Sequence, residues 1–307
     1  MTLYLSEQDV ESLVGPDDAL TVIEASCRRS ADEPGESSTR SRVAVGRATL
    51  TVEAAADAGL DSAGVLATAN GRAAAAVLVL FDANGDLTAV VEGPHLARLR
   101  TGAASALAAR RLARPDARTL GVIGCGGHAR WQVRCLRAAL PRVERVVAYC
   151  RTPERLADFC ARTGAEEAGS GREAAGQDVV VTATTSRDPV VRGEWLAPGA
   201  LVCAVGATAR ESRELDNAVV ERTAFVCCDS KPTAEHDAGD LREPVEQGVL
   251  DWLEVHELAE VVTGAVVGRQ AASDIVLFKS IGAAAWDIAL AAYAVGRARE
   301  SGVGRTL

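Results

Sequence analysis

The sequence predicts an α/β protein that combines a Rossmann-type dinucleotide-binding domain, with a doubly wound parallel sheet, and an α+β N-terminal domain. Three observations support this fold class. A glycine-rich turn follows a short apolar run within residues 119–129. Apolar and amphipathic segments alternate from there to about residue 229, which is the pattern of βα units. The residues before the turn lack that alternation and carry a hairpin signal instead.

Composition limits the classes of protein that need considering. The chain has 307 residues, of which 48% are hydrophobic and 24% are charged, as expected for an ordinary globular protein of one or two domains. The net charge of −9, without a basic cluster, argues against a nucleic-acid partner. No apolar run reaches the roughly 20 residues of a membrane span, and the first residues lack a basic leader. We therefore expect a cytoplasmic protein with no membrane partner.

Metal binding and lysine chemistry are both disfavoured. The eight cysteines form no Cys-x-x-Cys pair and the four histidines are scattered, so we expect buried, reduced thiols and no metal site. The chain has two lysines, Lys231 and Lys279, and residues 1–230 contain none. This excludes a catalytic lysine from most of the chain.

The N-terminal part is expected to be an antiparallel sheet with helices. Residues 6–30 show the apolar spacing of one or two amphipathic helices, and residues 31–41 form a polar loop. Asn84-Gly85 is a good hairpin turn between two apolar runs. The expected strands are 42–53, 64–69, 75–82 and 87–92.

A long helix and then βα units are expected to follow. Residues 96–113 form an alanine-rich helix that Pro115 closes. Further helical segments lie near 251–263 and 278–301, and the last one could return to the N-terminal domain. The expected strands between them are 119–124, 145–150, 178–183, 201–206 and 224–229, with helices at about 128–139, 152–163 and 214–221.

The turn reads Gly124-x-Gly126-x-x-Ala129, and its surroundings favour a dinucleotide site. The first glycine permits a tight turn from strand to helix, and the second lets the backbone approach a pyrophosphate. The small residue Ala129 lets the helix lie close to the strand, with its N-terminus aimed at the phosphates. A plain tight turn is the alternative interpretation of the motif.

The second strand of this region favours NADPH, with NADH as the alternative. An NAD site usually has an acidic residue at the end of this strand. Here the strand ends in Cys150-Arg151-Thr152, and an arginine with a hydroxyl suits a 2′-phosphate. In the alternative reading, Arg151 only solvates the turn and Thr152 caps the next helix.

Two later strands end in small residues that point to the same ligand. The sequences Thr182-Ala183-Thr184-Thr185-Ser186 and Ala204-Val205-Gly206-Ala207-Thr208 each end an apolar run. Ligands of open α/β sheets lie at such carboxyl ends, although small residues also make ordinary βα turns.

With these residues assembled, the chain resembles the ornithine cyclodeaminase/mu-crystallin family over nearly its whole length. Other motifs that carry the resemblance are Arg100-Thr101-Gly102-Ala103-Ala104-Ser105, Trp195-Leu196-Ala197-Pro198-Gly199, Arg213-Glu214-Leu215 and Phe278-Lys279-Ser280-Ile281-Gly282. The resemblance implies a homodimer and chemistry that interconverts an amine and an imine by hydride transfer next to a carboxylate. It implies a dimerising, substrate-binding domain (1–113 with 283–307, completed by the C-terminal helix) and a Rossmann domain (114–282).

The resemblance also assigns roles to individual residues. Arg100 and Arg42 match family arginines that bind the substrate carboxylate, which suits two guanidinium forks. Glu53 matches a substrate-contacting glutamate, with a surface charge on an edge strand as the alternative. The motifs and the resemblance together give the expected cofactor-binding residues, namely Thr101, Gly124, Gly126, Gly127, His128, Ala129, Arg151, Thr152, Thr184, Thr185, Ser186, Val205, Gly206, Ala207 and Ser280.

Two departures from the family pattern bear on the reaction. The substrate-site lysine of the family should fall near 64–67, where this chain has none, and the aspartate of the cyclodeaminases is replaced by Thr208. Because cyclodeamination needs both an acid or base at the amine and a distal carboxylate, it is disfavoured.

We therefore expect an NAD(P)H-dependent reductase of the ketimine or imino-acid type. The proton would come from water, Glu53 or His95. An amino-acid dehydrogenase or cyclodeaminase with altered acids and bases is one alternative. A non-catalytic, NADPH-dependent binding protein of the mu-crystallin type is another.

Overall fold

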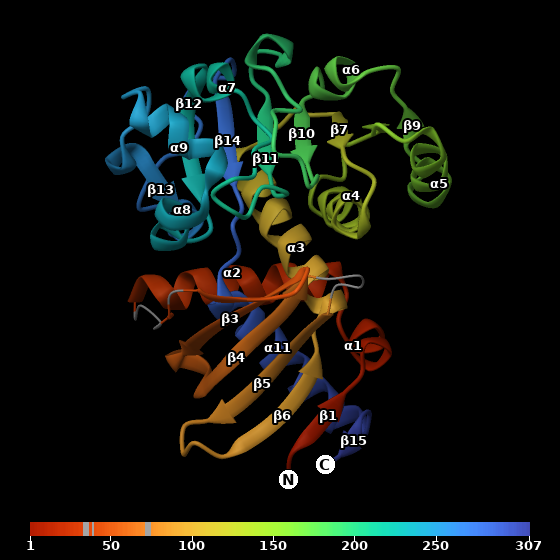
Figure 1. Ribbon diagram of the computed structural model, residues 1–307, viewed down its shortest axis with the longest axis vertical. Helices are drawn as coiled ribbons and strands as arrows, with labels where there is room; N and C mark the ends of the chain where they lie inside the picture. The colour runs from red at the N-terminus through yellow and green to blue at the C-terminus, as the bar shows by residue number, and fades with distance from the viewer. Residues whose placement is uncertain (33–36, 39, 71–74) are drawn as a thin grey trace. The chain divides into compact units, whose positions relative to one another are not determined.

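The computed structural model describes residues 1–32, 37–38, 40–70 and 75–307. The chain forms two compact units, whose elements are labelled in Figure 1. Unit 1 comprises residues 1–100 with 283–307, and unit 2 comprises residues 101–282. The first boundary lies inside helix α3 (Pro94–Leu112) and not at residue 113, where the sequence had placed it.

Unit 1 is built on a seven-stranded sheet in the order β15-β1-β6-β5-β4-β3-β2. Strand β1 pairs parallel with β6, and every other pairing described in this sheet is antiparallel. The strands are β1 (Leu3–Leu5), β2 (Ser41–Val45), β3 (Ala48–Asp57), β4 (Ser62–Asn70), β5 (Ala75–Asp82), β6 (Leu87–Glu92) and β15 (Arg305–Thr306).

Helices cover one face of this sheet. Helix α11 (Ala284–Ser301) packs on β3, β4 and β5 and against α2 (Pro16–Asp32), while α1 (Glu7–Leu13) packs on β6. Leu66, Leu78 and Leu80 point toward the helices and are buried. The C-terminal helix thus completes the N-terminal domain, as predicted, because its alanine-rich surface allows close packing on the sheet.

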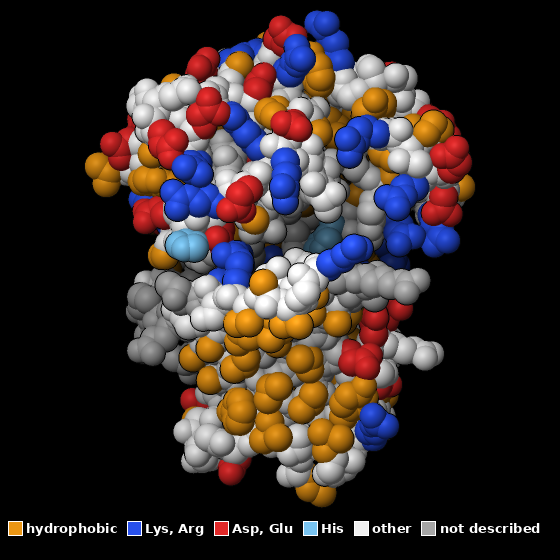
Figure 2. All heavy atoms as spheres, in the orientation of Figure 1, with side chains coloured by type: hydrophobic (Ala, Val, Ile, Leu, Met, Phe, Trp, Pro, Cys, Tyr) orange, Lys and Arg blue, Asp and Glu red, His pale blue; other side chains and the backbone are white. Residues whose placement is uncertain are grey.

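The other face of the same sheet is apolar and carries no helix among the described residues. Alternate residues on neighbouring strands face this side, and they are half-buried valines and a phenylalanine. Figure 2 shows them as a continuous hydrophobic area on unit 1. We call this area the open sheet face, and it includes Val52, Val65, Val79, Phe81 and Val90.

Unit 2 is a doubly wound parallel sheet of eight strands in the order β13-β12-β14-β11-β10-β7-β8-β9. From β7 the chain first adds strands on one side and then returns to add β10 on the other, so the order reverses at β7 and β10. The strands are β7 (Thr119–Ile123), β8 (Arg145–Tyr149), β9 (Glu166–Glu167), β10 (Val179–Thr182), β11 (Leu201–Ala204), β12 (Thr223–Cys228), β13 (Val255–Glu257) and β14 (Ile275–Lys279).

The central strands β10, β11 and β14 are buried along their whole length, as expected for a parallel sheet covered on both faces. The helices of the unit beyond α3 are α4 (Gly127–Ala139), α5 (Pro153–Thr163), α6 (Gly171–Ala175), α7 (Asn217–Glu221), α8 (Lys231–Asp237), α9 (Gly239–Glu246) and α10 (Leu258–Thr263), with 3-10 turns at η2 (Gly193–Trp195) and η3 (Trp252–Glu254). Unit 1 has a similar turn at η1 (Ala58–Leu60). The predicted α/β fold class is confirmed.

Some predicted elements were wrong. Residues 278–279 end the central strand β14 and do not begin a helix, and residues 255–257 form strand β13 within a segment predicted to be helical. The predicted strand 42–53 is a hairpin, β2 and β3. In the parts of the chain that the structure describes, no helix is long and apolar enough to cross a membrane.

Candidate functional site

The glycine turn lies between β7 and α4 and fits a pyrophosphate. Gly124 has a φ of +111°, and a Cβ there would lie 2.3 Å from the carbonyl oxygen of Ala183, so only glycine fits. Gly126 is the N-cap of α4, and as a glycine it has no side chain that could cap the helix. A Cβ on Gly126 would meet nothing within 4 Å. The N-cap residue itself thus leaves the first backbone N–H groups of α4 uncapped, and such groups are suited to binding an anion.

The remaining residues of the turn are placed as the motif requires. Ala129 is fully buried, while Gly127 and His128 form the first turn of α4 and His128 is exposed. The backbone N–H of Gly124 donates to Tyr149, the last residue of β8, over 2.9 Å. The turn and the end of β8 are thus linked directly.

The end of β8 presents a cation and a hydroxyl. Arg151 and Thr152 are both exposed. Thr152 is the N-cap residue of α5, but its side chain makes no capping hydrogen bond. The capping role that was the alternative for Thr152 is therefore not filled by its hydroxyl.

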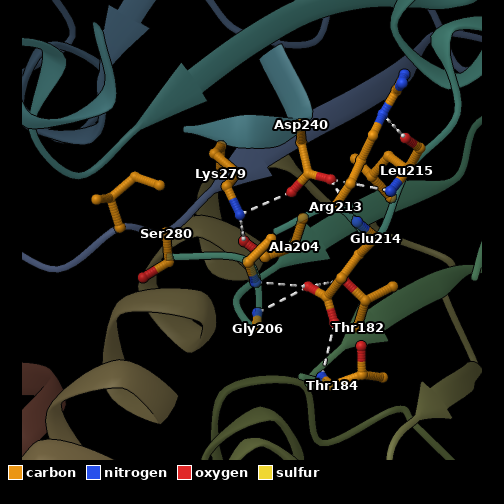
Figure 3. A network of polar contacts seen from close by, with 12 residues as sticks. Thr182, Thr184, Ala204, Gly206, Arg213, Glu214, Leu215, Asp240, Lys279 and Ser280 are labelled. Carbon is orange, nitrogen blue, oxygen red and sulfur yellow. Dashed lines mark hydrogen bonds and ion pairs between the residues drawn. The ribbon is translucent and has the colours of Figure 1, made fainter. Parts of the chain in front are cut away.

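The ends of β10 and β11 are held together by the carboxylate of Glu214 (Figure 3). Oε1 accepts the backbone N–H of Thr184 at 2.6 Å, and Oε2 accepts those of Gly206 at 2.8 Å and Ala207 at 3.1 Å. Oε2 also accepts the hydroxyl of Thr182 at 2.8 Å. This single buried side chain fixes both loops that sequence analysis assigned to the cofactor.

Gly206 is required for this arrangement. A Cβ at this position would lie 2.4 Å from Oε1 of Glu214 and 2.3 Å from the carbonyl oxygen of Thr184. Its neighbours Val205 and Ala207 are buried. In the loop after β10, Thr185 is exposed and Ser186 is half-buried, and the Ser186 N–H donates to Oγ1 of Thr184 at 3.1 Å.

Asp240 and Lys279 form a buried ion pair, and Asp240 holds the backbone of Glu214. Oδ1 of Asp240 accepts the backbone N–H groups of Glu214 at 2.6 Å and Leu215 at 2.9 Å. Lys279 Nζ lies 2.9 Å from Oδ2 of Asp240 and donates to the carbonyl oxygen of Ala204 at 3.3 Å (Figure 3). Burial raises the pKa of Glu214, and the nearby Lys279 ammonium opposes that increase.

Two expected cofactor residues, Ser280 and Thr101, are buried and make internal hydrogen bonds. Ser280 is buried and donates to Asp229 over 2.8 Å. Thr101 is buried, and its carbonyl oxygen accepts from Ser105 at 3.3 Å and Gln132 at 3.1 Å. Their roles stay predictions.

Unit 1 holds the expected substrate residues. Arg100 in α3 donates from Nε to Oδ1 of Asp287 in α11 at 3.0 Å, and both residues are buried. Glu53 on β3 is buried and accepts Nε–H of Arg40 at 2.8 Å. Burial raises the pKa of Glu53, while Arg40 and Arg100 oppose the increase. Arg42 is exposed on β2.

Arg40 was missed by sequence analysis. The register pairs Arg42 with Thr51, which lies two positions before Glu53, so Arg42 and Glu53 share one face of the sheet. Arg40 lies two positions before Arg42 and contacts Glu53 directly. Strand alternation could have shown that both arginines belong to one face, but not which of them contacts Glu53. Glu214, Asp240 and Lys279 were also given no role, although a lysine at the end of an apolar run is a detectable signal.

The two departures from the family pattern are visible in the structure. Leu66 of β4 lies directly opposite Glu53 in the register, in the segment where the lysine was expected, and is buried. Thr208 is exposed in the loop after β11. His95, the other candidate proton donor, is buried in the first turn of α3.

Comparisons with known proteins agree with the resemblance. A family model, the ornithine cyclodeaminase/mu-crystallin family, matches residues 2–302. Delta(1)-pyrroline-2-carboxylate reductase of Paracoccus denitrificans is 35% identical over 225 residues, which is 71% of each chain.

Solved structures match over the whole chain. Delta(1)-pyrroline-2-carboxylate reductase of Thermococcus litoralis, in complex with NADH and L-proline, has a TM-score of 0.94 at 29% identity and covers 99% of this chain and 100% of its own. An archaeal alanine dehydrogenase dimer with bound NAD has a TM-score of 0.93 at 29% identity, covering 100% of this chain and 98% of its own. This chain belongs to the ornithine cyclodeaminase/mu-crystallin family.

Proposed function

We propose that the protein is an NAD(P)H-dependent reductase of a C=N bond in an imine that carries a carboxylate. The observation that carries the proposal is the full-length likeness to a reductase in complex with NADH and L-proline. The glycine turn, with a glycine N-cap and nothing within 4 Å of a Cβ built at Gly126, fits the phosphates of such a cofactor.

The roles of the substrate residues are part of this proposal. Arg100 and Arg42 bind the substrate carboxylate and thereby orient the C=N carbon, which is a positioning effect. Arg40 acts on the same face by holding Glu53. The proton comes from Glu53, from water or from His95. The bound nicotinamide supplies the hydride. Because a protonated iminium is already electrophilic, reduction does not require the family lysine that is missing from residues 64–67.

Dehydrogenation of an amino acid is the second candidate. The likeness to an alanine dehydrogenase with bound NAD favours it. It runs the same hydride transfer in reverse, so the same residues would serve. Ammonia release from an amino acid in the presence of NAD(P)⁺ would identify it.

We infer a preference for NADPH over NADH. Arg151 is exposed at the end of β8, where a 2′-phosphate would lie, and the hydroxyl of Thr152 is not used as a cap. A cytoplasmic location fits the same proposal, because all eight cysteines are free thiols, which a reducing compartment maintains.

We also infer a homodimer formed through the open sheet face of unit 1. Apolar areas of this kind on a protein surface mark interaction sites, and a relative of this fold is a dimer. Val79→Lys, in the middle of this face, should give a monomer in light scattering coupled to size exclusion. Leu253→Lys is the matched control, because Leu253 is 84% exposed and lies in unit 2. A Val79→Lys protein of unchanged mass would contradict the proposed interface.

The activity is tested by oxidation of NADPH and NADH against a panel of cyclic and acyclic imino acids. We expect turnover with at least one carboxylate-bearing imine and none with the matching imine that lacks the carboxylate. Tight NADPH binding without turnover on the whole panel would instead indicate the non-catalytic binding protein.

A further inference from the structure

Three buried charged side chains lie beneath the loops that follow β10 and β11 in unit 2. Glu214, Asp240 and Lys279 are each 0% exposed. The proposed reaction uses none of them. Two acids and one base in a buried cluster are costly unless every charge is paired or hydrogen-bonded. Their partners therefore show what the cluster does.

The partners of Glu214 are backbone groups of the cofactor loops. Its carboxylate accepts the N–H groups of Thr184, Gly206 and Ala207, at 2.6, 2.8 and 3.1 Å. Because N–H groups can only donate, the ionised carboxylate satisfies all three. The loop after β10 and the loop after β11 are thus both fastened to one side chain.

Asp240 and Lys279 hold Glu214 in place. Asp240, in the first turn of α9, accepts the backbone N–H of Glu214 itself at 2.6 Å. Lys279, at the end of β14, lies 2.9 Å from the other oxygen of Asp240 and donates to Ala204 at the end of β11. The contacts form one continuous chain from β14 through α9 to the two loops (Figure 3).

The order of the strands indicates which half of a dinucleotide these loops would meet. In this fold the adenosine ribose lies at the end of the second strand, here β8, and the pyrophosphate lies at the N-terminus of the first helix, here α4. The other half of the molecule must then extend over β10 and β11, on the opposite side of the point where strand order reverses. Those are the strands whose ends Glu214 fixes.

We propose that Glu214, Asp240 and Lys279 are positioning residues for the nicotinamide half of the cofactor site. They fix the loops at 184–186 and 205–207 before the cofactor arrives, so that little ordering remains to be done on binding. This inference rests on the proposed function for the identity of the cofactor. It goes beyond it by assigning the network to one half of the ligand.

A half-buried carboxylate elsewhere in the same unit, Asp178, provides a control. Asp178 accepts the backbone N–H groups of Arg118 at 2.9 Å and Thr119 at 3.0 Å. It thus holds a loop, as Glu214 does, but at the amino ends of β7 and β10, whereas Glu214 lies at the carboxyl ends of β10 and β11. If carboxylates that hold loops matter only for folding, then Asp178→Asn and Asp240→Asn should have the same effects on the melting temperature and on the Kd of each ligand.

The test compares two ligands on the full-length protein. The first is the reduced dinucleotide that the wild type binds more tightly, and the second is the corresponding fragment without nicotinamide, ADP-ribose or its 2′-phosphate. For Asp240→Asn and for Lys279→Met we expect the Kd of the dinucleotide to rise about tenfold or more, with the Kd of the fragment within about twofold of the wild-type value. Asp178→Asn should leave both Kd values unchanged while lowering the melting temperature.

The double variant Asp240→Asn/Lys279→Met gives a second readout. Because it removes both charges, it should fold better than Lys279→Met alone, yet it should still weaken the dinucleotide selectively. Equal weakening of dinucleotide and fragment, or no change in either, would overturn the proposal.

If the charge variants do not fold, Thr182→Val keeps the proposal open to refutation. It removes the hydroxyl that donates to Glu214 at 2.8 Å while keeping a similar side-chain volume. We expect a smaller but still selective loss of dinucleotide affinity, and an equal loss for both ligands would count against the proposal. The binding assay needs no imine. If the variants lose dinucleotide affinity selectively, as expected, but the wild type turns over no imine, only the proposed function is contradicted.

Discussion

Arg100 of α3 and Asp287 of α11 form a buried contact between residues 187 positions apart, with 3.0 Å between Nε and Oδ1. Both residues are in unit 1, and Arg100 is 7% and Asp287 1% exposed. Because one N–H of the guanidinium is committed to Asp287, the plane of the fork is set before any substrate arrives. A carboxylate would meet a pre-oriented arginine, which reduces the cost of binding it.

Arg100→Ala is expected to abolish most of the activity. The relevant charge pair is the one between Arg100 and the substrate carboxylate. Truncating one partner of a buried, hydrogen-bonded charge pair costs about 2–5 kcal/mol, so kcat/KM for an imino acid should fall by about 30-fold or more. Steady-state kinetics with the best imine of the panel measures the effect. The variant should also lose its preference for imines that bear a carboxylate.

Arg98→Ala is the control for Arg100→Ala. Arg98 lies in the same helix and also contacts an acid, Glu7, at 3.2 Å, but its side chain is 34% exposed. An exposed pair of this kind contributes little, so kinetics and stability should stay close to wild type. Unchanged kcat/KM in Arg100→Ala would show that this arginine does not bind the carboxylate.

Gly126→Ala should weaken the binding of the dinucleotide without changing the stability of the fold. The free protein has room for the added methyl group, since nothing lies within 4 Å of a Cβ there. The same methyl group would stand where a pyrophosphate approaches the backbone. We expect the melting temperature to stay unchanged and the Kd of the reduced dinucleotide to rise. Gly296→Ala, with similarly free space inside α11, should leave that Kd unchanged.

Arg151→Ala should weaken NADPH more than NADH. Hydrogen bonds to charged groups contribute about 1.5–3 kcal/mol, so the Kd of NADPH should rise by about tenfold or more. Arg155→Ala, an exposed change one turn further along α5, should affect neither cofactor. Equal effects of Arg151→Ala on both cofactors would remove the argument for a 2′-phosphate.

The pH dependence of stability should report the buried position of Glu53. Burial raises the pKa of this carboxyl above its unfolded value despite the neighbouring Arg40. Folding therefore favours the protonated form, so the stability that goes with it is present below the unfolded pKa and is lost as the pH rises through the folded pKa. The free energy of unfolding of Glu53→Gln, relative to wild type, should increase with pH from about 4 upward.

Glu92 offers a comparison of opposite sign. The hydroxyl of Tyr4 and the backbone N–H of Glu7 donate to this carboxylate and lower its pKa. Its contribution is present above the unfolded pKa and is lost as the pH falls. The free energy of unfolding of Glu92→Gln, relative to wild type, should therefore decrease as the pH rises. Urea titrations across the pH range measure both variants, and curves of the same slope would contradict the assignment for Glu53.

Local patterns were sufficient to predict the architecture. Gly124 and Gly126 have roles that depend on neighbours a few residues away, so the motif located the turn and the strand before it. The alternation of short apolar runs and helices then required a parallel sheet, because the helix of each βα unit returns the chain to the end of the sheet where the previous strand began. The alanine-rich last helix was placed with unit 1 by the family resemblance and not by a local pattern.

Long-range pairing was what the sequence could not supply. Lys279 was assigned to a helix because a lysine at the end of a buried strand is tolerated only when a partner such as Asp240 is folded against it. Arg40 was missed because its contact with Glu53 depends on how β2 and β3 pair. The register also identified Leu66 as the residue opposite Glu53, where sequence analysis could only point to a segment.

The complete burial of Lys279 has a practical consequence. It is one of only two lysines in the chain, and its ammonium is enclosed with Asp240, so amine-reactive reagents cannot reach it in the folded protein. Such reagents would label Lys231 and the N-terminal amine. A dye or a surface linker would therefore be confined to these two amines without mutagenesis, and the appearance of label on Lys279 would give a direct chemical signal that unit 2 has opened.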